Sequence, residues 1–213
     1  SSHGTEGRGI SPGLLISPCS NEKSSGPAGE RIQDKISRRN AMPPRLSHLK
    51  ILGYRAFREI SAPLDSLEVL VGANGTGKSS LFEFLRFLRD SMTQERPPEI
   101  VTGAVGQQVF HKPGPDRIEW EAQIDLGDVP LHYYGQLKGP LGLPYFTEEH
   151  VLGRDDDFRY LGVVLGKGRM RERKKNAPYP VVLRRPNQSA MSLATNPAFT
   201  TLYDLRGYIE SWR

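Results

Sequence analysis

Thiols are almost absent from this chain: its 213 residues include a single cysteine, Cys19. One thiol cannot build an intrachain disulfide framework or a cluster of thiolate metal ligands. The three histidines of the central region, His111, His132 and His150, show no helical metal-binding spacing. We therefore expect an ordinary hydrophobic core in a reducing compartment, and zinc-finger classes are excluded.

Long apolar runs are also lacking. No stretch approaches the roughly 20 apolar residues that a membrane span needs. The N-terminus has no basic segment followed by an apolar stretch and a small-residue cleavage site, so a signal peptide is not indicated. We expect a cytoplasmic protein with no membrane partner.

Basic charge is in excess, but it is unevenly placed. The formal net charge is +5 and the pI is about 9.4. Residues 1–46 contain seven Lys/Arg and four Asp/Glu, and residues 166–175 contain six Lys/Arg and one Glu. The rest of the chain is slightly acidic. The overall charge is therefore weak evidence for nucleic-acid binding.

Residues 1–46 differ in composition from the rest. They are rich in Ser, Gly and Pro and show no sustained helical or alternating apolar pattern. Such a segment cannot bury enough apolar surface to offset its ordering entropy. We predict a disordered tail over 1–46 and a folded part over 47–213. Since the chain begins with Ser, Met42 is a candidate for the biological start.

A strand, a loop and a helix are predicted in succession near the middle of the chain. Residues 67–71 form an apolar run that ends at Gly72, which indicates a buried strand entering a loop. Apolar residues then recur at spacings of three and four over 81–92, which is typical of an amphipathic helix. This helix should end before Pro97.

Strands and one more helix are predicted around this unit. Strand-like runs occur near 49–60, and alternating or apolar runs bounded by Gly or Pro at 118–126, 131–137 and 160–165 predict antiparallel strands. Residues 200–212 have helical apolar spacing. The chain stops directly after this helix, so we expect it to be truncated.

The loop between the predicted strand and helix matches the pattern G-x-x-x-x-G-K-[ST]. Glycines let successive amides face a phosphate, and the helix N-terminus points its positive dipole end at the same anion. Lys78 would contact the β- and γ-phosphates of a nucleotide and act as a catalytic residue, and the Ser79 hydroxyl would bind Mg²⁺. The candidate nucleotide-binding residues are Gly72, Ala73, Asn74, Gly75, Thr76, Gly77, Lys78, Ser79 and Ser80.

The loop sequence GANGTGKSS, with LKILGYRAF over 49–57 and LFEFL over 81–85, resembles the opening of ABC-type AAA ATPases of the RecF/SMC-like and OLD-like groups. The resemblance continues more weakly over 188–193 and 202–212. It implies an α/β P-loop NTPase head with an antiparallel β subdomain. It further implies ATP and Mg²⁺ as ligands, a second head as partner, and DNA repair or defence as setting.

The chain departs from that family pattern in its later motifs. No apolar run ends in Asp-Glu, as a Walker B strand would, and no Leu-Ser-Gly-Gly signature is present. The nearest acidic segments are 124–126 and 155–157, and neither follows a buried four-residue strand. We therefore expect the N-terminal half of a head, truncated before Walker B. It would bind ATP but need its missing C-terminal half for hydrolysis.

Two further contacts are candidates, one with the magnesium ion and one with the nucleotide. Gln94, Gln107 and Gln108 lie where the family has a magnesium-contacting glutamine, although each is also typical of a solvated loop. Arg55 is a candidate for stacking on the base or contacting phosphate.

A basic strip is formed by Lys167, Arg169, Arg171 and Arg173. On a strand, this period of two would place the four charges on one face, where they could follow a DNA backbone. The alternative is a solvated hairpin edge whose charges deter strand pairing.

Two other functions stay open at this point. A degenerate or truncated P-loop protein could serve only as an interaction module, and the missing acids favour that interpretation. Another P-loop enzyme, such as a kinase or GTPase, is a further alternative, although no Asn-Lys-x-Asp motif of a GTPase is present.

Overall fold

The computed structural model describes residues 42–65, 68–94, 108–139, 143–175 and 177–213. Within them the first strand begins at Arg45, so the last two residues of the predicted tail belong to the folded part. Residues 42–44 of that prediction are exposed and have no regular structure, and residues 1–41 lie outside the described residues. No helix among the described residues is both long and apolar enough to cross a membrane.

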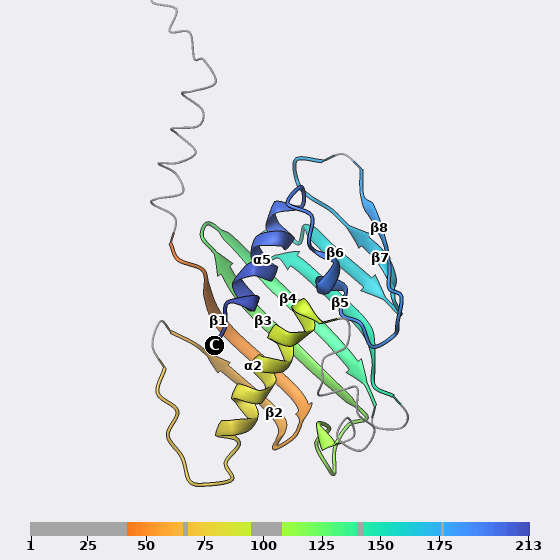
Figure 1. The fold of residues 1–213 in the computed structure, drawn as a ribbon. Coiled ribbons are helices and arrows are strands. Elements are labelled where there is room, and N and C mark those ends of the chain that lie inside the picture. Colours follow the sequence, from red (N-terminus) through yellow and green to blue (C-terminus); the bar gives the residue numbers. More distant parts are fainter. Residues whose placement is uncertain (1–41, 66–67, 95–107, 140–142, 176) are drawn as a thin grey trace, which may run out of the picture. The chain divides into compact units, whose positions relative to one another are not determined.

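One antiparallel sheet of eight strands dominates the described part of the chain, in the order β2-β1-β3-β4-β5-β6-β7-β8 (Figure 1). Three helical elements with fully described bounds accompany it. The strands are β1 (Arg45–Tyr54), β2 (Phe57–Pro63), β3 (Arg117–Leu126), β4 (Val129–Lys138), β5 (Tyr145–Gly153), β6 (Arg159–Val164), β7 (Lys167–Met170) and β8 (Tyr179–Val182), and the helical elements are α2 (Lys78–Thr93), the 3-10 helix η1 (Ala190–Leu193) and α5 (Thr200–Glu210).

Side chains alternate between the two faces of this sheet, and one face is mostly apolar. On this face, a row of cross-strand partners that runs from β1 through β3 to β7 is buried throughout. Because neighbouring partners share a face, they form a continuous apolar surface. One such row contains Leu49, Ala122, Tyr133, Val151, Leu161 and Met170. Figure 1 shows α2 and α5 lying over this face.

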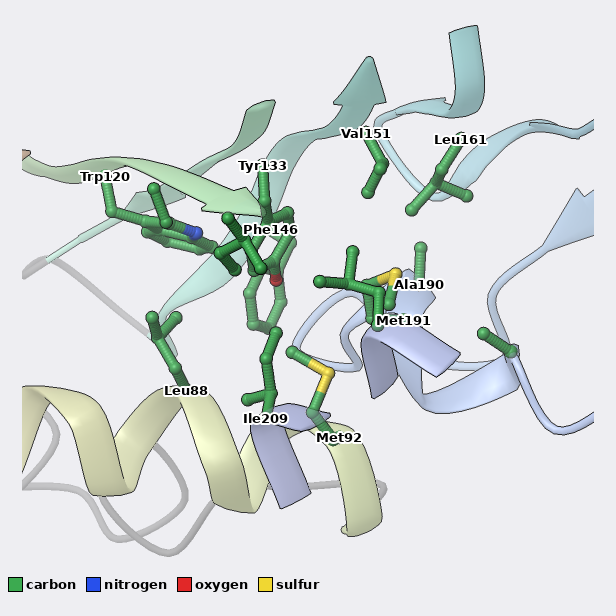
Figure 2. Packing of buried hydrophobic residues seen from close by; sticks show 14 of the residues in the cluster. Leu88, Met92, Trp120, Tyr133, Phe146, Val151, Leu161, Ala190, Met191 and Ile209 are labelled. Carbon is green, nitrogen blue, oxygen red and sulfur yellow. The ribbon is translucent and has the colours of Figure 1, made fainter. Parts of the chain in front are cut away.

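Trp120 of β3 lies at the centre of the core beneath α2. Its ring makes edge-to-face contacts with Phe84 and Phe87 of the helix and with Tyr133 and Phe146 of the sheet, at centroid distances of 6.0–6.2 Å. Such aromatic pairs add about 0.5–1.5 kcal/mol each beyond area burial. Figure 2 shows further apolar side chains of α2, α5 and η1 meeting the sheet at this level.

Most predicted elements are confirmed. The amphipathic helix is α2, the alternating runs are β3, β4 and β6, and the C-terminal helix is α5. The first predicted strands are β1 and β2, and all pairings are antiparallel as expected. The sequence patterns did not identify β5 or β8. Strand β7 is present, but β8 pairs with it, so β7 is not the edge of the sheet.

The predicted buried strand over 67–71 is wrong for its described part. Residues 68–71 belong to no strand, and the side chains of Val69 and Val71 are 76% and 89% exposed. An apolar run becomes a buried strand only where a neighbouring strand supplies hydrogen bonds and another layer covers it. Among the described residues, both edges of β1 are already taken, by β2 and β3.

A buried carboxylate joins η1 to the sheet. Glu149 of β5 is 1% exposed and accepts hydrogen bonds from Tyr133 Oη (2.8 Å), Ser189 Oγ (2.7 Å) and the Ala190 amide (2.6 Å). Burial raises the pKa of Glu149, and these hydrogen bonds oppose that shift. Burial, followed by the charge of Glu149, raises the pKa of Tyr133 well above its usual value, so Tyr133 remains a donor.

Replacing Gly135 by alanine should destabilise the fold, because the added Cβ would lie 2.0 Å from Cζ2 of Trp120. We expect Gly135→Ala to lower the free energy of unfolding by about 1–3 kcal/mol, measured by urea denaturation. The matched control is Gly207→Ala in α5, where a Cβ meets nothing within 4 Å. It should raise stability by up to about 1 kcal/mol. Equal effects of the two substitutions would contradict this account of the Trp120 site.

Stability should depend on pH through Glu149. Since folding raises its pKa, its contribution is complete below the ordinary value of 4.5 and is lost as the pH rises through the folded pKa. The free energy of unfolding of the wild type, relative to Glu149→Gln, should therefore fall as the pH rises above 4.5, by up to about 1.4 kcal/mol per unit. Denaturation from pH 4 to 8 tests this. A difference that does not change with pH would show that Glu149 has the same pKa in both states.

Candidate functional site

The loop over 72–77 connects the exposed segment 68–71 to α2. Two of its glycines have left-handed backbone conformations, Gly75 with φ 85° and Gly77 with φ 97°. Thr76 closes a turn, since its hydroxyl donates to the Ala73 carbonyl at 2.9 Å and its amide lies 3.4 Å from the same oxygen. The glycine pattern of the sequence thus corresponds to positive φ angles that other residues rarely adopt.

Lys78, the first residue of α2, reaches back across this loop. Its Nζ donates to the carbonyl oxygens of Gly72 at 2.5 Å and Ala73 at 2.7 Å. The ammonium group is therefore held at the mouth of the loop by two neutral acceptors. An anionic oxygen placed there would form stronger, charge-assisted hydrogen bonds with the same group.

The N-terminus of α2 is free of competing anions. Its N-cap, Gly77, has no side chain to bond the helix amides, and no acidic residue lies in the first turn. The first backbone bond of the helix runs from the Leu81 amide to the Gly77 carbonyl at 3.0 Å. The preceding amides, of Lys78, Ser79 and Ser80, have no acceptor within the helix, which is the geometry of an anion site. Ser79 is exposed, as a metal-binding hydroxyl would need to be.

The turn between β1 and β2 supports the loop from beneath. A Cβ built on Gly77 would lie 2.6 Å from the Phe57 ring and 3.4 Å from the Ala56 Cβ. Arg55, in the same turn, has a φ of 46°, and its amide donates to the Val109 carbonyl at 2.7 Å. The loop and this turn are therefore packed together, as the Arg55 prediction requires.

The Arg55 guanidinium itself is engaged by the helix. Its Nε lies 3.0 Å from a carboxylate oxygen of Glu83, one turn into α2. The sequence patterns placed Glu83 on the polar side of the helix but did not identify this pair. Arg55 is thus close to the loop, and a nucleotide contact would require it to share or leave Glu83.

The three candidate glutamines have different positions. Gln94 is the C-cap of α2. It is separated from Lys78 by 16 residues of helix, about 24 Å, so it cannot serve a site at the helix N-terminus. Gln107 lies outside the described residues. Gln108 is exposed and adjoins Val109, the residue that bonds Arg55, which makes it the candidate nearest the loop support.

The acidic segments named as nearest to a Walker B motif have structural partners. Asp125 pairs with Arg45 at 3.3 Å and with Arg154 at 2.9 Å. Asp156 lies in an exposed turn and pairs with Arg173. Among the described residues, no group of three His, Cys, Asp or Glu side chains can hold a metal ion. His111 instead contacts the Arg55 carbonyl through Nδ1 at 2.8 Å.

An apolar hollow of about 690 Å³ lies between the first two strands and α2. Its lining includes Ile60, Leu70, Leu81 and Phe82, and the side chain of Phe82 is 60% exposed. Leu70, which lines the hollow, belongs to the exposed segment 68–71. The sequence patterns did not predict it, because they assigned residues 67–71 to a buried strand.

The loop should be sensitive to a side chain at Gly77 more than at Gly75. Both positions have positive φ, but only at Gly77 would a Cβ also clash, with Phe57. We expect Gly77→Ala to lower the free energy of unfolding by about 1 kcal/mol or more beyond Gly75→Ala. Urea denaturation of the two variants measures this. Equal destabilisation would mean that the loop does not rest on the β1–β2 turn.

Residues 45–129 match the family model described as the AAA ATPase domain. The match includes the loop, α2 and the first three strands. It supports an AAA-type ATPase family, and with the mostly antiparallel sheet it fits a partial P-loop-like fold. Such a domain implies ATP binding, usually with Mg²⁺. The chain matches no curated protein sequence.

Proposed function

From the AAA ATPase domain match, we propose that this chain binds ATP with Mg²⁺ through the loop over 72–79. The observation that carries the proposal is the position of Lys78, whose ammonium group is held across the loop at the N-terminus of α2. A triphosphate offers this group anionic acceptors in place of two neutral carbonyls. The cofactors would be ATP and Mg²⁺.

The roles of the site residues follow from their positions. The free amides at the start of α2 would bind phosphate oxygens, Lys78 would bridge the β- and γ-phosphates, and the exposed Ser79 hydroxyl would be a Mg²⁺ ligand. Gln108 is our candidate for the glutamine beside the metal. Arg55 would contact the nucleotide after its ion pair with Glu83 of α2 breaks.

Hydrolysis needs groups that the described residues do not supply at the loop. Asp125 and Asp156 are paired with arginines, and Glu83 is paired with Arg55. While these three carboxylates remain paired they cannot orient water or hold the metal, so turnover loses both positioning and electrostatic stabilisation. We therefore propose that this chain binds ATP without turning it over, as the N-terminal half of an ATPase head.

The exposed apolar surface supports the proposal that a C-terminal half completes the head. Val69 and Val71 are largely exposed, and the hollow beside them is lined by apolar side chains of α2 and β2. A partner segment that pairs with 68–71 would supply the hydrogen bonds that a strand needs and cover this surface. The ABC-type subtype, a second head, and a cytoplasmic role in DNA repair or defence belong to the same proposal.

Titration with ATP tests the site. Wild-type protein should bind ATP, and Lys78→Ala should weaken binding by about tenfold or more, since a charge-assisted contact of about 1.5–3 kcal/mol is lost. Ser79→Ala should reduce the increase in ATP affinity that Mg²⁺ produces. The control is Lys138→Ala at an exposed position on β4, which should bind as the wild type does. Calorimetry with and without Mg²⁺ measures all four proteins.

Two results would contradict the proposal. If ATP binding is absent or is unchanged in Lys78→Ala, the loop is not the nucleotide site, and a non-catalytic interaction module becomes the better function. If the purified chain sustains Lys78-dependent phosphate release, it is not the incomplete half that we propose.

A further inference from the structure

The second face of the sheet, opposite α2 and α5, is polar. Its side chains are half-exposed or exposed, and they alternate with the buried row along each strand. One cross-strand row on it contains Lys50, Glu121, Tyr134, His150, Gly162 and Arg169. We call this surface the open face. It is a broad surface whose function the nucleotide site does not explain.

Charge is strongly segregated along the strands that form this face. Residues 159–185, which span β6, β7 and β8, contain nine Lys/Arg and one acidic residue, Glu172. Residues 42–158, which include β1 to β5, contain 12 Lys/Arg and 17 Asp/Glu. The positive charge is therefore concentrated at one end of the sheet, near the edge formed by β8.

The acidic residues of the open face are mostly neutralised within the sheet. Lys50 lies 3.6 Å from Glu59 and 3.8 Å from Glu121. Arg117 pairs with Glu119 on the same strand. Glu148 is an exception: it lies 3.6 Å from the His150 imidazole, whose pKa is lowered, so this contact does not neutralise its charge. The β1–β5 half of the face thus satisfies most of its own charges.

The basic residues at the other end are not neutralised in this way. Lys167, Arg169 and Arg171 are exposed, and no side-chain ion pair is present for them among the described residues. Arg173, the fourth member of the predicted strip, is different: it bonds Asp156 and Tyr160 and lies 4.8 Å from the Phe158 ring centroid. The Arg173 side chain is therefore occupied by contacts within the fold. Of the predicted strip, the basic side chains without an ion pair among the described residues are Lys167, Arg169 and Arg171.

Arg159 joins this strip from the neighbouring strand. A Cβ built on Gly162 would lie 2.7 Å from the Arg159 Cδ, so the Arg159 side chain lies over Gly162. Gly162 faces Arg169 directly across the β6–β7 pair. Burial, followed by the charge of Arg159, lowers the pKa of His150, which agrees with this placement. Four cations thus meet on one patch.

The spacing of the patch suits a chain of phosphates. Lys167 and Arg169 are alternate residues of β7, which lie about 6.6 Å apart on a strand, of the order of the phosphate separation in an extended single strand. Arg171 follows the end of β7, and its amide donates to the Tyr160 carbonyl of β6 at 2.7 Å. Arginine guanidinium groups form paired hydrogen bonds with phosphate oxygens. The acidic part of the face is largely paired within itself, whereas these cations have no ion-pair partner in the described part of the chain. This arrangement favours binding of an external polyanion over association with a second copy of this chain.

We propose that Arg159, Lys167, Arg169 and Arg171 form a sequence-independent binding surface for the phosphate backbone of a nucleic acid. Exposed Val164, Leu165 and Val182 adjoin the strip, so an anionic membrane surface is the competing partner that the test must separate. Most of the groups are arginines on an open sheet rather than lysines around an apolar helix, which favours nucleic acid. This proposed surface is independent of the proposed ATP site, so either can be present without the other.

Fluorescence anisotropy with a labelled 20-nucleotide DNA, single-stranded and as a duplex, tests the surface over a range of salt concentrations. Arg169→Gln with Arg171→Gln should weaken binding by roughly tenfold or more near 0.1 M salt. For a single strand, the magnitude of the slope of log K against log salt should fall by about 1.4. The control is Lys112→Gln with Lys138→Gln, which removes the same charge from exposed positions outside the strip and should change both quantities less.

Three outcomes would overturn the proposal. Wild-type protein that binds neither DNA at about 50 mM salt excludes it, as does an equal loss in the control pair. Binding to vesicles containing anionic lipid, lost in the strip variant, with no DNA binding, would identify a membrane surface instead. Unchanged urea denaturation of the double variant would show that any loss of binding is not unfolding.

Discussion

The indole of Trp120 packs against Phe84 and Phe87, and this contact joins the sheet to the helix whose first residue is Lys78. The sheet has one apolar face that must be covered, and α2 provides much of the cover. Because the helix is fixed by its buried side, its N-terminus has little freedom to move. The position of the loop is therefore set by the core.

A second contact fixes the other side of the loop. Gly77 lies so close to the Phe57 ring that a side chain there would clash. The β1–β2 turn is in turn bonded to Val109 and paired through Arg55 to Glu83. The N-terminal end of α2 is thus fixed by the core on one side and by the turn on the other, which holds its free amides and the Lys78 ammonium group in place. Such preorganisation reduces the ordering that binding requires.

The regular part of this architecture could be predicted from the sequence because its signals are local. Apolar spacing identified α2 and α5, and alternation identified β3 and β4. Short strands rich in Gly or Pro, such as β7 and β8, give weak signals, since their stability comes from neighbours. Of the site, the glycine and lysine positions followed from the motif. The Arg55–Glu83 pair and the exclusion of Gln94 depend on where α2 lies, which no local pattern contains.

The wrong prediction over 67–71 carries physical information of its own. Val69, Leu70 and Val71 have the composition of a buried strand, yet they are exposed beside an apolar hollow. Soluble monomers rarely leave such surface uncovered, and a strand without a partner leaves its backbone groups to water. Both the hydrogen bonds and the covering layer would come from one added strand with an apolar side. Under the proposed function, that strand would run beside the segment that leads directly into the loop of Lys78.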